Sequence, residues 1–293
     1  VDPELHGVGA VLFDEFHERR LASDLSLARV LDVQEGSRSD LKVFVMSATL
    51  ETVELLDYLK PCDLLEAGGR MYPVEIVYQP PPAPRRGKQG AMESIPVWEQ
   101  VGTVCRSELK ALREWKESGA GNGPRILIFL PGAFEIRRTV ELLERSSWSR
   151  GWEIKPLYSG LSPTAQTEAV SPGKAPRIIV ATNVAETSIT IDGVAAVIDS
   201  GLVRMASYDS RRAIDTLTVG KVSQASAQQR AGRAGRTGPG RCVRLWSERD
   251  HARRPGFEQP EVHRIDLSLS LIHISEPTRL RRISYAVFCV KKK

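Results

Sequence analysis

Two acidic residues and a histidine follow the first apolar run of the chain, in the stretch Asp14-Glu15-Phe16-His17-Glu18-Arg19. If Val8–Phe13 is a strand of an open α/β sheet, these side chains lie at its carboxyl end, where ligands of such sheets gather. One carboxylate there suits Mg²⁺ beside a phosphate chain, and the next suits orientation of a water molecule. The alternative is that the pair caps a helix N-terminus, where negative charge is favourable.

Three arginines separated by small residues form the strongest single signal, in Gln228-Gln229-Arg230-Ala231-Gly232-Arg233-Ala234-Gly235-Arg236. On a helix, residues three apart lie on the same side, so the arginines would share one face. Alanine and glycine spacers permit close packing while guanidinium groups bind phosphate oxygens. The alternative is an ordinary solvated face, which does not need small residues between its charges.

Small polar residues follow two further apolar runs. Ser47-Ala48-Thr49 comes after Leu41–Met46, and the polar stretch Thr182–Gly193 comes after Arg177–Ala181. Hydroxyl groups at strand ends can hydrogen-bond across a cleft and link two sites, but serine and threonine are also ordinary turn residues. The alternative for 182–193 is a polar loop without a binding role.

The elements that must position these residues are predicted from apolar runs that do not alternate with polar residues. Such runs indicate strands buried on both faces, as in a parallel sheet covered by helices. The predicted strands are Val8–Phe13, Leu41–Met46, Arg125–Leu130, Arg177–Ala181 and Ala195–Ile198. The predicted helices are Leu21–Val33, Thr52–Leu59, Ser94–Ser118 and Phe134–Ser146. Their alternation along the chain predicts an α/β fold.

The proline- and glycine-rich stretch Gln79–Gly90 is predicted to be a loop, and a domain boundary is placed just before it. Residues 1–72 then hold only two strands, so they are expected to be the C-terminal half of a domain. Residues 73–250 are expected to form a second domain. We therefore expect two α/β domains, the first only partly present.

The composition is that of a folded protein, with 41% hydrophobic and 26% charged residues among 293. No apolar run approaches the roughly 20 residues of a membrane-spanning helix. The four cysteines are scattered, which argues against a disulfide framework or zinc site and favours a reducing, cytoplasmic compartment.

The net charge of +5 arises in residues 269–293, which hold six basic residues and one acidic residue. Of the totals of 41 and 36, this leaves 35 basic and 35 acidic residues elsewhere. The strings LSLIHISEPTR and ISYAVFCVKKK in this tail resemble translated sequencing-library adapter, with Val290 as a departure. The alternative is a genuine basic tail. We exclude the segment from fold reasoning.

The zero net charge of residues 1–268 is compatible with nucleic-acid binding, because a local basic patch suffices.

Taken together and in order, these blocks resemble the DEAH/RHA branch of superfamily 2 helicases. The variant Asp14–Arg19, followed by LDVQEG and VMSATL, is similar to the bacterial HrpB-type members. Further matches are Gly69–Val74, Ile128–Gly132 and Asp199–Arg204. The resemblance covers residues 1–268, and it implies that residues 251–268 begin a further helical or winged-helix region. It implies two RecA-like domains with ATP between them, Mg²⁺ as cofactor, and nucleic acid as partner, RNA rather than DNA.

The resemblance also implies a role for each matching residue. For the nucleotide, Asp14 organises the metal Mg²⁺, Glu15 orients the attacking water, Gln229 contacts the γ-phosphate region, Arg233 and Arg236 act as arginine fingers, and Asp192 contacts the nucleotide. For coupling to strand separation, the matching residues are His17, Ser47 and Thr49. For the nucleic-acid backbone, they are Ser159, Thr182 and Asn183. Arg204–Ser223 fits the β-hairpin that this family uses as a strand-separating wedge, the alternative being an ordinary edge hairpin.

Some departures from the family pattern leave other functions open. The sequence contains no G-x-x-x-x-G-K-[ST] phosphate loop, and Pro172-Gly173-Lys174 does not supply one. We expect that loop upstream of residue 1 and expect these 293 residues alone to be inactive. Val170 stands where family members often stack adenine on an aromatic ring. The alternatives are a non-catalytic nucleic-acid-binding fragment and a DNA-directed translocase of the same superfamily.

Overall fold

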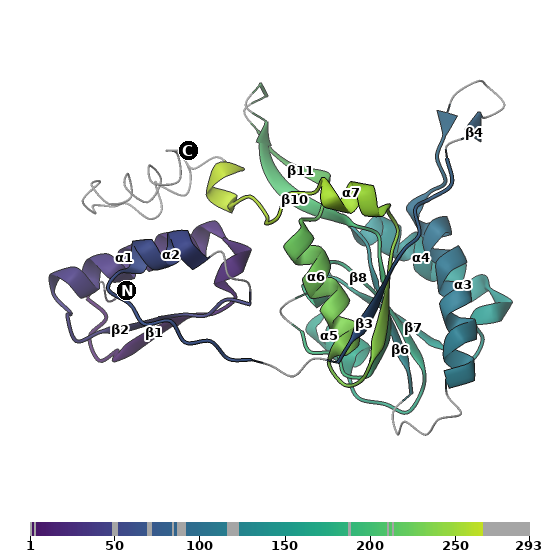
Figure 1. Cartoon of the computed structure of the whole chain (residues 1–293), viewed down its shortest axis with the longest axis horizontal. Coiled ribbons are helices and arrows are strands. Elements are labelled where there is room, and N and C mark those ends of the chain that lie inside the picture. Colours follow the sequence, from purple (N-terminus) through teal and green to yellow (C-terminus); the bar gives the residue numbers. More distant parts are fainter. Residues whose placement is uncertain are drawn as a thin grey trace. The chain divides into compact units, whose positions relative to one another are not determined.

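The computed structural model describes residues 2, 4–48, 52–68, 72–83, 85–86, 92–115, 123–186, 189–209, 211–212 and 214–265. These residues fall into two compact units (Figure 1). Unit 1 contains the described residues within 1–66, within 206–218 and from 258 onward, and unit 2 contains those within 67–205 and 219–257. The predicted boundaries at residues 72 and 250 stay predictions, and the adapter-like tail lies outside the described residues.

Unit 2 is built on a six-stranded sheet in which every neighbouring pair of strands is parallel. In spatial order the strands are β3 (Val74–Tyr78), β12 (Gly240–Arg244), β9 (Val194–Asp199), β6 (Arg125–Phe129), β8 (Arg177–Ala181) and β7 (Glu153–Leu157). All residues of β6, β8 and β9 are buried, as their continuous apolar sequences predict. The predicted α/β fold with a parallel sheet is confirmed.

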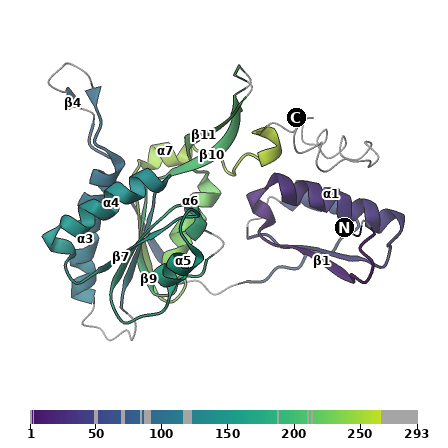
Figure 2. The same ribbon diagram turned by 180° about the vertical axis from the view of Figure 1, so that it is seen from behind.

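Helices cover both faces of this sheet (Figures 1 and 2). Ile126 and Ile128 of β6 pack in the core with α3 (Val97–Trp115) and α4 (Ala133–Arg145). Leu127 and Phe129 share the opposite core with α5 (Pro163–Val170), α6 (Gln224–Gly232) and the 3₁₀ turn η5 (Arg233–Gly235). The alternation of side chains along one strand thus fills two cores.

The first turn of α6 is fixed by a serine cap. The Ser226 N–H donates to Ser223 Oγ at 3.1 Å, satisfying one of the N–H groups that a helix start leaves unpaired. The elements that the sequence did not predict include two short strands. These are β4 (Arg85–Arg86) and β5 (Met92–Glu93), which form an antiparallel pair. The prediction that Gln79–Gly90 is entirely a loop is therefore wrong for Arg85 and Arg86, which form β4.

Unit 1 contains the parallel strands β1 (Ala10–Phe13) and β2 (Lys42–Val45), with the helices α1 (Leu21–Gly36) and α2 (Thr52–Leu59). Burial alternates along both strands. Leu12 is 60% exposed and Phe44 is 49% exposed, while Val11, Phe13 and Val43 pack in a small core. The expectation that these two strands are buried on both faces is wrong within the described residues, because one apolar face stays exposed.

Four further elements, two strands and two short helical segments, lie in the C-terminal third of the chain. β10 (Leu202–Asp209) and β11 (Ile214–Lys221) form a two-stranded sheet in the stretch where a hairpin was expected. α7 (Glu248–Ala252) follows β12 along the chain, and the 3₁₀ turn η6 (Glu261–His263) lies near the end of the described residues. Among the described residues, no helix is long and apolar enough to cross a membrane.

Candidate functional site

The carboxylates that follow β1 lie beside the segment that follows β2. Because the two strands are parallel, their carboxyl ends meet at one edge. The Met46 N–H donates to Phe13 O at 2.7 Å, and the Phe16 N–H donates back to Met46 O at 3.0 Å. The side chains of Asp14 and Ser47 are exposed at this edge. Thr49, the third residue expected here, lies outside the described residues.

His17 contacts both of these segments. Its Nδ1 accepts the Ala48 N–H at 3.3 Å, and its Nε2 lies 3.4 Å from Glu15 Oε2. Acceptance at Nδ1 places the proton of the neutral ring on Nε2, facing the carboxylate. The His17 side chain is only 8% exposed, whereas that of Glu15 is 40% exposed. A buried imidazole therefore joins an accessible carboxylate to the Ser47-Ala48 segment.

The backbone around these residues does not support a helix-capping role for Asp14 and Glu15. Glu15 precedes the 3₁₀ turn η1 (Phe16–Glu18) with φ 51° and forms no side-chain cap hydrogen bond. The N-cap of α1 is Arg20. The Asp14 Oδ1 instead accepts the Glu15 N–H at 2.8 Å. A left-handed conformation at a residue other than glycine is costly and is concentrated at functional sites.

This edge offers oxygen ligands rather than an enclosed metal site. Among the described residues, no group of three or more histidine, cysteine, aspartate or glutamate side chains is placed to hold an ion. An Mg²⁺ ion that accompanies phosphates needs only one or two carboxylates, since phosphate oxygens and water complete its shell. The exposed carboxylate of Asp14 fits that type of site.

The three arginines of the Gln228–Arg236 segment do not share one face. α6 ends at Gly232 and continues as the tighter turn η5, which changes the angle between successive residues. Arg230 and Arg233 are 1% and 2% exposed, while Arg236 is exposed. The predicted common face is wrong, and so is the solvated-face alternative for the first two arginines.

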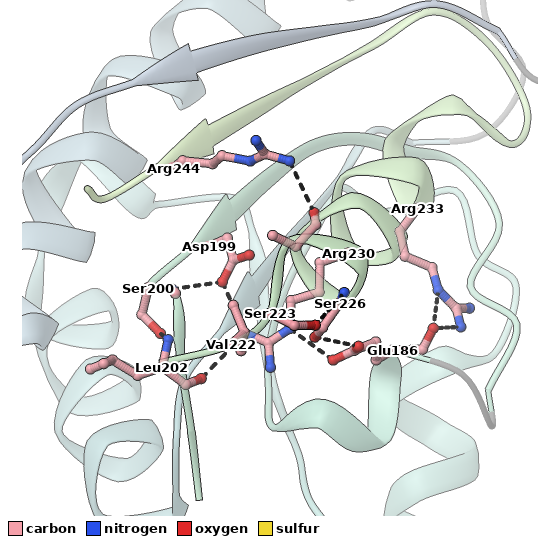
Figure 3. Close-up of polar contacts among 12 residues, drawn as sticks. Glu186, Asp199, Ser200, Leu202, Val222, Ser223, Ser226, Arg230, Arg233 and Arg244 are labelled. Carbon is pink, nitrogen blue, oxygen red and sulfur yellow. Dashed lines mark hydrogen bonds and ion pairs between the residues drawn. The ribbon is translucent and has the colours of Figure 1, made fainter. Parts of the chain in front are cut away.

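Arg230 is the centre of a buried ionic network (Figure 3). Its Nε donates to Glu186 Oε2 at 2.8 Å, and its Nη1 donates to Asp199 Oδ1 at 2.9 Å and to Leu202 O at 3.2 Å. Its guanidinium carbon also lies 4.9 Å from the centroid of the Phe129 ring. Burial alone would lower the pKa of Arg230, but the carboxylates of Asp199 and Glu186 together raise it. The charge is therefore firmly kept.

Glu186 links this network to Arg233. Its Oε1 accepts from the Ser226 hydroxyl at 2.5 Å, and its backbone carbonyl accepts from Arg233 Nε at 2.9 Å and also from Arg233 Nη2. Arg233 Nη1 donates to Ile189 O at 2.6 Å. The two buried arginines thus fasten α6 and η5 to the polar segment that follows β8 (Figure 3).

The other predicted residues lie at two opposite edges of the sheet. Thr182 and Asn183 directly follow β8, and Ser159 follows the neighbouring strand β7, so these three share the carboxyl edge. The Thr182 N–H donates to Leu157 O at 3.1 Å. Ser159 and Asn183 are exposed, and Thr182 is half-buried.

Asp192 and Arg236 precede the adjacent strands β9 and β12, and both are exposed at the amino edge. Gln229 lies half-buried on α6. The residues predicted to bind nucleic acid are therefore separated from Asp192 and Arg236 by the length of the strands.

Sequence reasoning missed the two carboxylates that hold Arg230. Glu186 lies within the polar segment 182–193, and Asp199 is the last residue of an otherwise apolar strand. An acidic residue that ends a buried strand needs a cationic partner, so the signal was available. Their pairing with Arg230 across 44 and 31 residues is visible only in the structure.

Comparisons with known proteins agree with this geometry. Residues 108–238 match the helicase conserved C-terminal domain family. The chain is 40% identical over 275 residues to the ATP-dependent RNA helicase HrpB of Escherichia coli K12, covering 93% of this chain and 31% of that protein. It is 35% identical to the ATP-dependent RNA helicase HrpA homolog of Haemophilus influenzae, covering 94% of this chain and 20% of that protein.

The crystal structure of the Escherichia coli DEAH/RHA helicase HrpB superposes with a TM-score of 0.79 at 38% identity, over 93% of this chain and 32% of that chain. The chain thus spans about a third of the length of these HrpB proteins. The ordered motifs, the parallel sheet and these matches place the chain among the DEAH/RHA-type helicases, with a helicase C-terminal domain at residues 108–238.

Proposed function

We propose that the complete protein is an ATP-dependent RNA helicase that couples ATP hydrolysis to movement along, or unwinding of, nucleic acid. The observation that carries the proposal is the contact of His17 with both Glu15 and Ala48. This contact offers a physical route by which a change at the hydrolytic carboxylate reaches the Ser47–Thr49 segment. The names of the relatives support RNA as the substrate.

The nucleotide-binding roles are proposed as follows. Asp14 holds Mg²⁺, which neutralises charge on the phosphate oxygens, and Glu15 orients the attacking water. Gln229 contacts the terminal phosphate, Arg233 and Arg236 stabilise the charge that develops there, and Asp192 contacts the nucleotide. Arg236 is already exposed, whereas Arg233 must exchange its carbonyl partners to reach a phosphate.

The nucleic-acid roles are assigned to the carboxyl edge of unit 2. We propose that Ser159, Thr182 and Asn183 hold the backbone of the bound strand, because hydroxyl and amide groups there are accessible without being charged. The hairpin of β10 and β11 separates strands. Discrimination of RNA from DNA requires contact with the 2′-hydroxyl.

Two further proposals concern the chain and its compartment. Since these 293 residues contain no phosphate loop, we propose that they do not hydrolyse ATP by themselves. A reducing cytoplasm is proposed because Cys62, Cys105 and Cys242 are free thiols.

The test is ATP turnover by the complete protein with and without single-stranded RNA or DNA of the same sequence. Stimulation by RNA that is lost in Glu15→Gln is the expected result. Equal stimulation by both nucleic acids would favour a general translocase. Binding of nucleic acid without any turnover would favour the non-catalytic alternative.

A further inference from the structure

The short turn from Glu261 to Arg264 makes hydrogen bonds to two different parts of unit 1. It comprises η6 and its C-cap residue, and it is closed by the Arg264 N–H donating to Glu261 O at 2.9 Å. None of the proposed nucleotide or nucleic-acid roles uses it. Its contacts therefore need a separate explanation.

One end of the turn holds the start of α1. Glu261 Oε2 accepts the Leu21 N–H at 2.7 Å, and the Glu261 N–H donates to Arg19 O at 3.0 Å. The N-cap residue Arg20 supplies no side-chain cap. A carboxylate at a helix N-terminus pairs with an otherwise unpaired N–H group and is favoured by the helix dipole. Glu261 thus caps α1 from 240 residues away.

The other end of the turn holds the strand β10. The Tyr208 N–H donates to Arg264 O at 2.6 Å, and Arg264 Nη1 donates to Ala206 O at 3.1 Å. Arg264 Nε donates to Gln259 O at 2.9 Å, which fixes the guanidinium plane. Two hydrogen bonds therefore join the turn to the hairpin, and two others join it to Arg19 and to Leu21, the first residue of α1.

We propose that this turn is a mechanical tie between the hydrolytic segment and the strand-separating hairpin, with Glu261 and Arg264 as its positioning residues. α1 begins two residues after Arg19, and Arg19 closes the η1 turn that carries His17. Displacement of η1 is therefore transmitted through Arg19 and Leu21 to the tie, and from the tie to β10. This inference rests on the proposed function, since it assigns a route for coupling within that activity.

The test measures duplex unwound per ATP hydrolysed by the complete protein. Glu261→Ala and Arg264→Ala are expected to leave RNA-stimulated ATP turnover within about 2-fold of the unmodified protein and to lower unwinding by about 5- to 30-fold, the upper part of the range for residues that carry coupling. The double variant is expected to unwind no worse than either single variant, because both break one tie. Glu144→Ala and Arg253→Ala, at exposed positions, are the matched controls.

Hydrogen exchange separates the tie from a merely local cap. Glu261→Ala is expected to accelerate exchange at the Leu21 amide and also at the Tyr208 amide, while Glu261→Gln, which keeps an oxygen acceptor, restores unwinding to within about 2-fold. Unchanged unwinding per ATP in both alanine variants, or additive losses in the double variant, would overturn the tie and leave the helicase assignment intact. Absence of ATP turnover in the unmodified protein would overturn the proposed function itself.

Discussion

The candidate functional residues of unit 1 and those of unit 2 differ in how far their charged groups are exposed to solvent. At the edge formed by β1 and β2, Asp14 is exposed and the Glu15 side chain is 40% exposed, so both carboxylates can be reached from solvent. In unit 2, Arg230 and Asp199 are almost fully buried, and Glu186 is nearly so. The carboxylate oxygens at the β1–β2 edge are therefore accessible to a ligand, whereas the charged groups around Arg230 hydrogen-bond to one another inside the protein.

This difference indicates which property each region controls. Removing a buried partner leaves an unpaired charge in a medium of low polarity, which is strongly destabilising. Removing an accessible carboxylate costs little stability, because water solvates whatever replaces it. We therefore expect substitutions at the exposed groups to change turnover and substitutions in the buried network to change folding.

The largest effect is expected at Arg236, the exposed member of the arginine series. Arg236→Ala is predicted to lower ATP turnover of the complete protein by about 10³-fold or more, since arginine fingers contribute roughly that much. Its free energy of unfolding should change by less than about 0.5 kcal/mol, as at other exposed positions. Single-turnover hydrolysis with saturating RNA measures the first quantity. Arg150→Ala, also exposed, is the control.

A somewhat smaller loss is expected at Glu15. Glu15→Gln keeps the size of the side chain but removes the carboxylate, so turnover should fall by about 10²- to 10⁴-fold, the usual contribution of a positioned base. The same assay checks it. ATP turnover within about 2-fold of the unmodified protein would show that Glu15 is not the hydrolytic group. It would also contradict the expectation that the exposed carboxylates control turnover.

The buried network is expected to respond through stability. Arg230→Ala leaves the carboxylates of Glu186 and Asp199 without their main partner, which should cost about 3–5 kcal/mol. Glu186→Gln should cost less, because the amide oxygen still accepts a hydrogen bond. Urea unfolding of both variants measures these differences. A loss below 1 kcal/mol for Arg230→Ala would mean that the ion pairs do not hold this region.

The smallest effect expected is a pH dependence of the stability of unit 2, through His251 on α7. Burial lowers the pKa of His251, and the nearby charges of Arg244 and Arg254 lower it further, although Asp199 and Asp250 oppose them. The unfolded chain then takes up this proton first, so stability is full above about pH 6.5 and is lost as pH falls through the folded pKa. The slope from one proton is at most about 1.4 kcal/mol per pH unit.

His251→Asn should remove this component, which urea unfolding at pH 7 and at acid pH would detect. An identical pH dependence in the variant would assign the acid loss to other groups. Because Asp14 and Glu15 lie in unit 1 and are accessible, their substitution should not change the loss of stability at acid pH that is assigned to His251.

The strands with continuous apolar sequences could be predicted well, and the more polar ones could not. Arg177–Ala181 matches β8 at both ends, because hydrophobic burial alone specifies it. β7 contains a glutamate, a lysine and a proline, and β12 contains two arginines among its five residues. Their place in the sheet depends on parallel neighbours distant in sequence, which no local pattern encodes.

The candidate site shows the same limit. The strand-end positions of Asp14, Ser47 and Thr182 follow from the apolar runs that precede them. The division of the arginines could not be predicted, because spacing by three assumes an unbroken α-helix and the chain tightens into η5 at Arg233. Which arginine is buried depends on Glu186 and Asp199, whose approach requires the folded sheet.

Hydrogen exchange of the β9 amides in Arg230→Ala and Arg236→Ala tests the division of roles most directly. β9 is buried along its whole length and ends at Asp199, so its exchange reports the stability of the network. The account predicts that Arg230→Ala accelerates exchange by at least about 100-fold, as a loss near 3 kcal/mol implies, while Arg236→Ala leaves it unchanged. Equal acceleration in both variants, or none in Arg230→Ala, would contradict it.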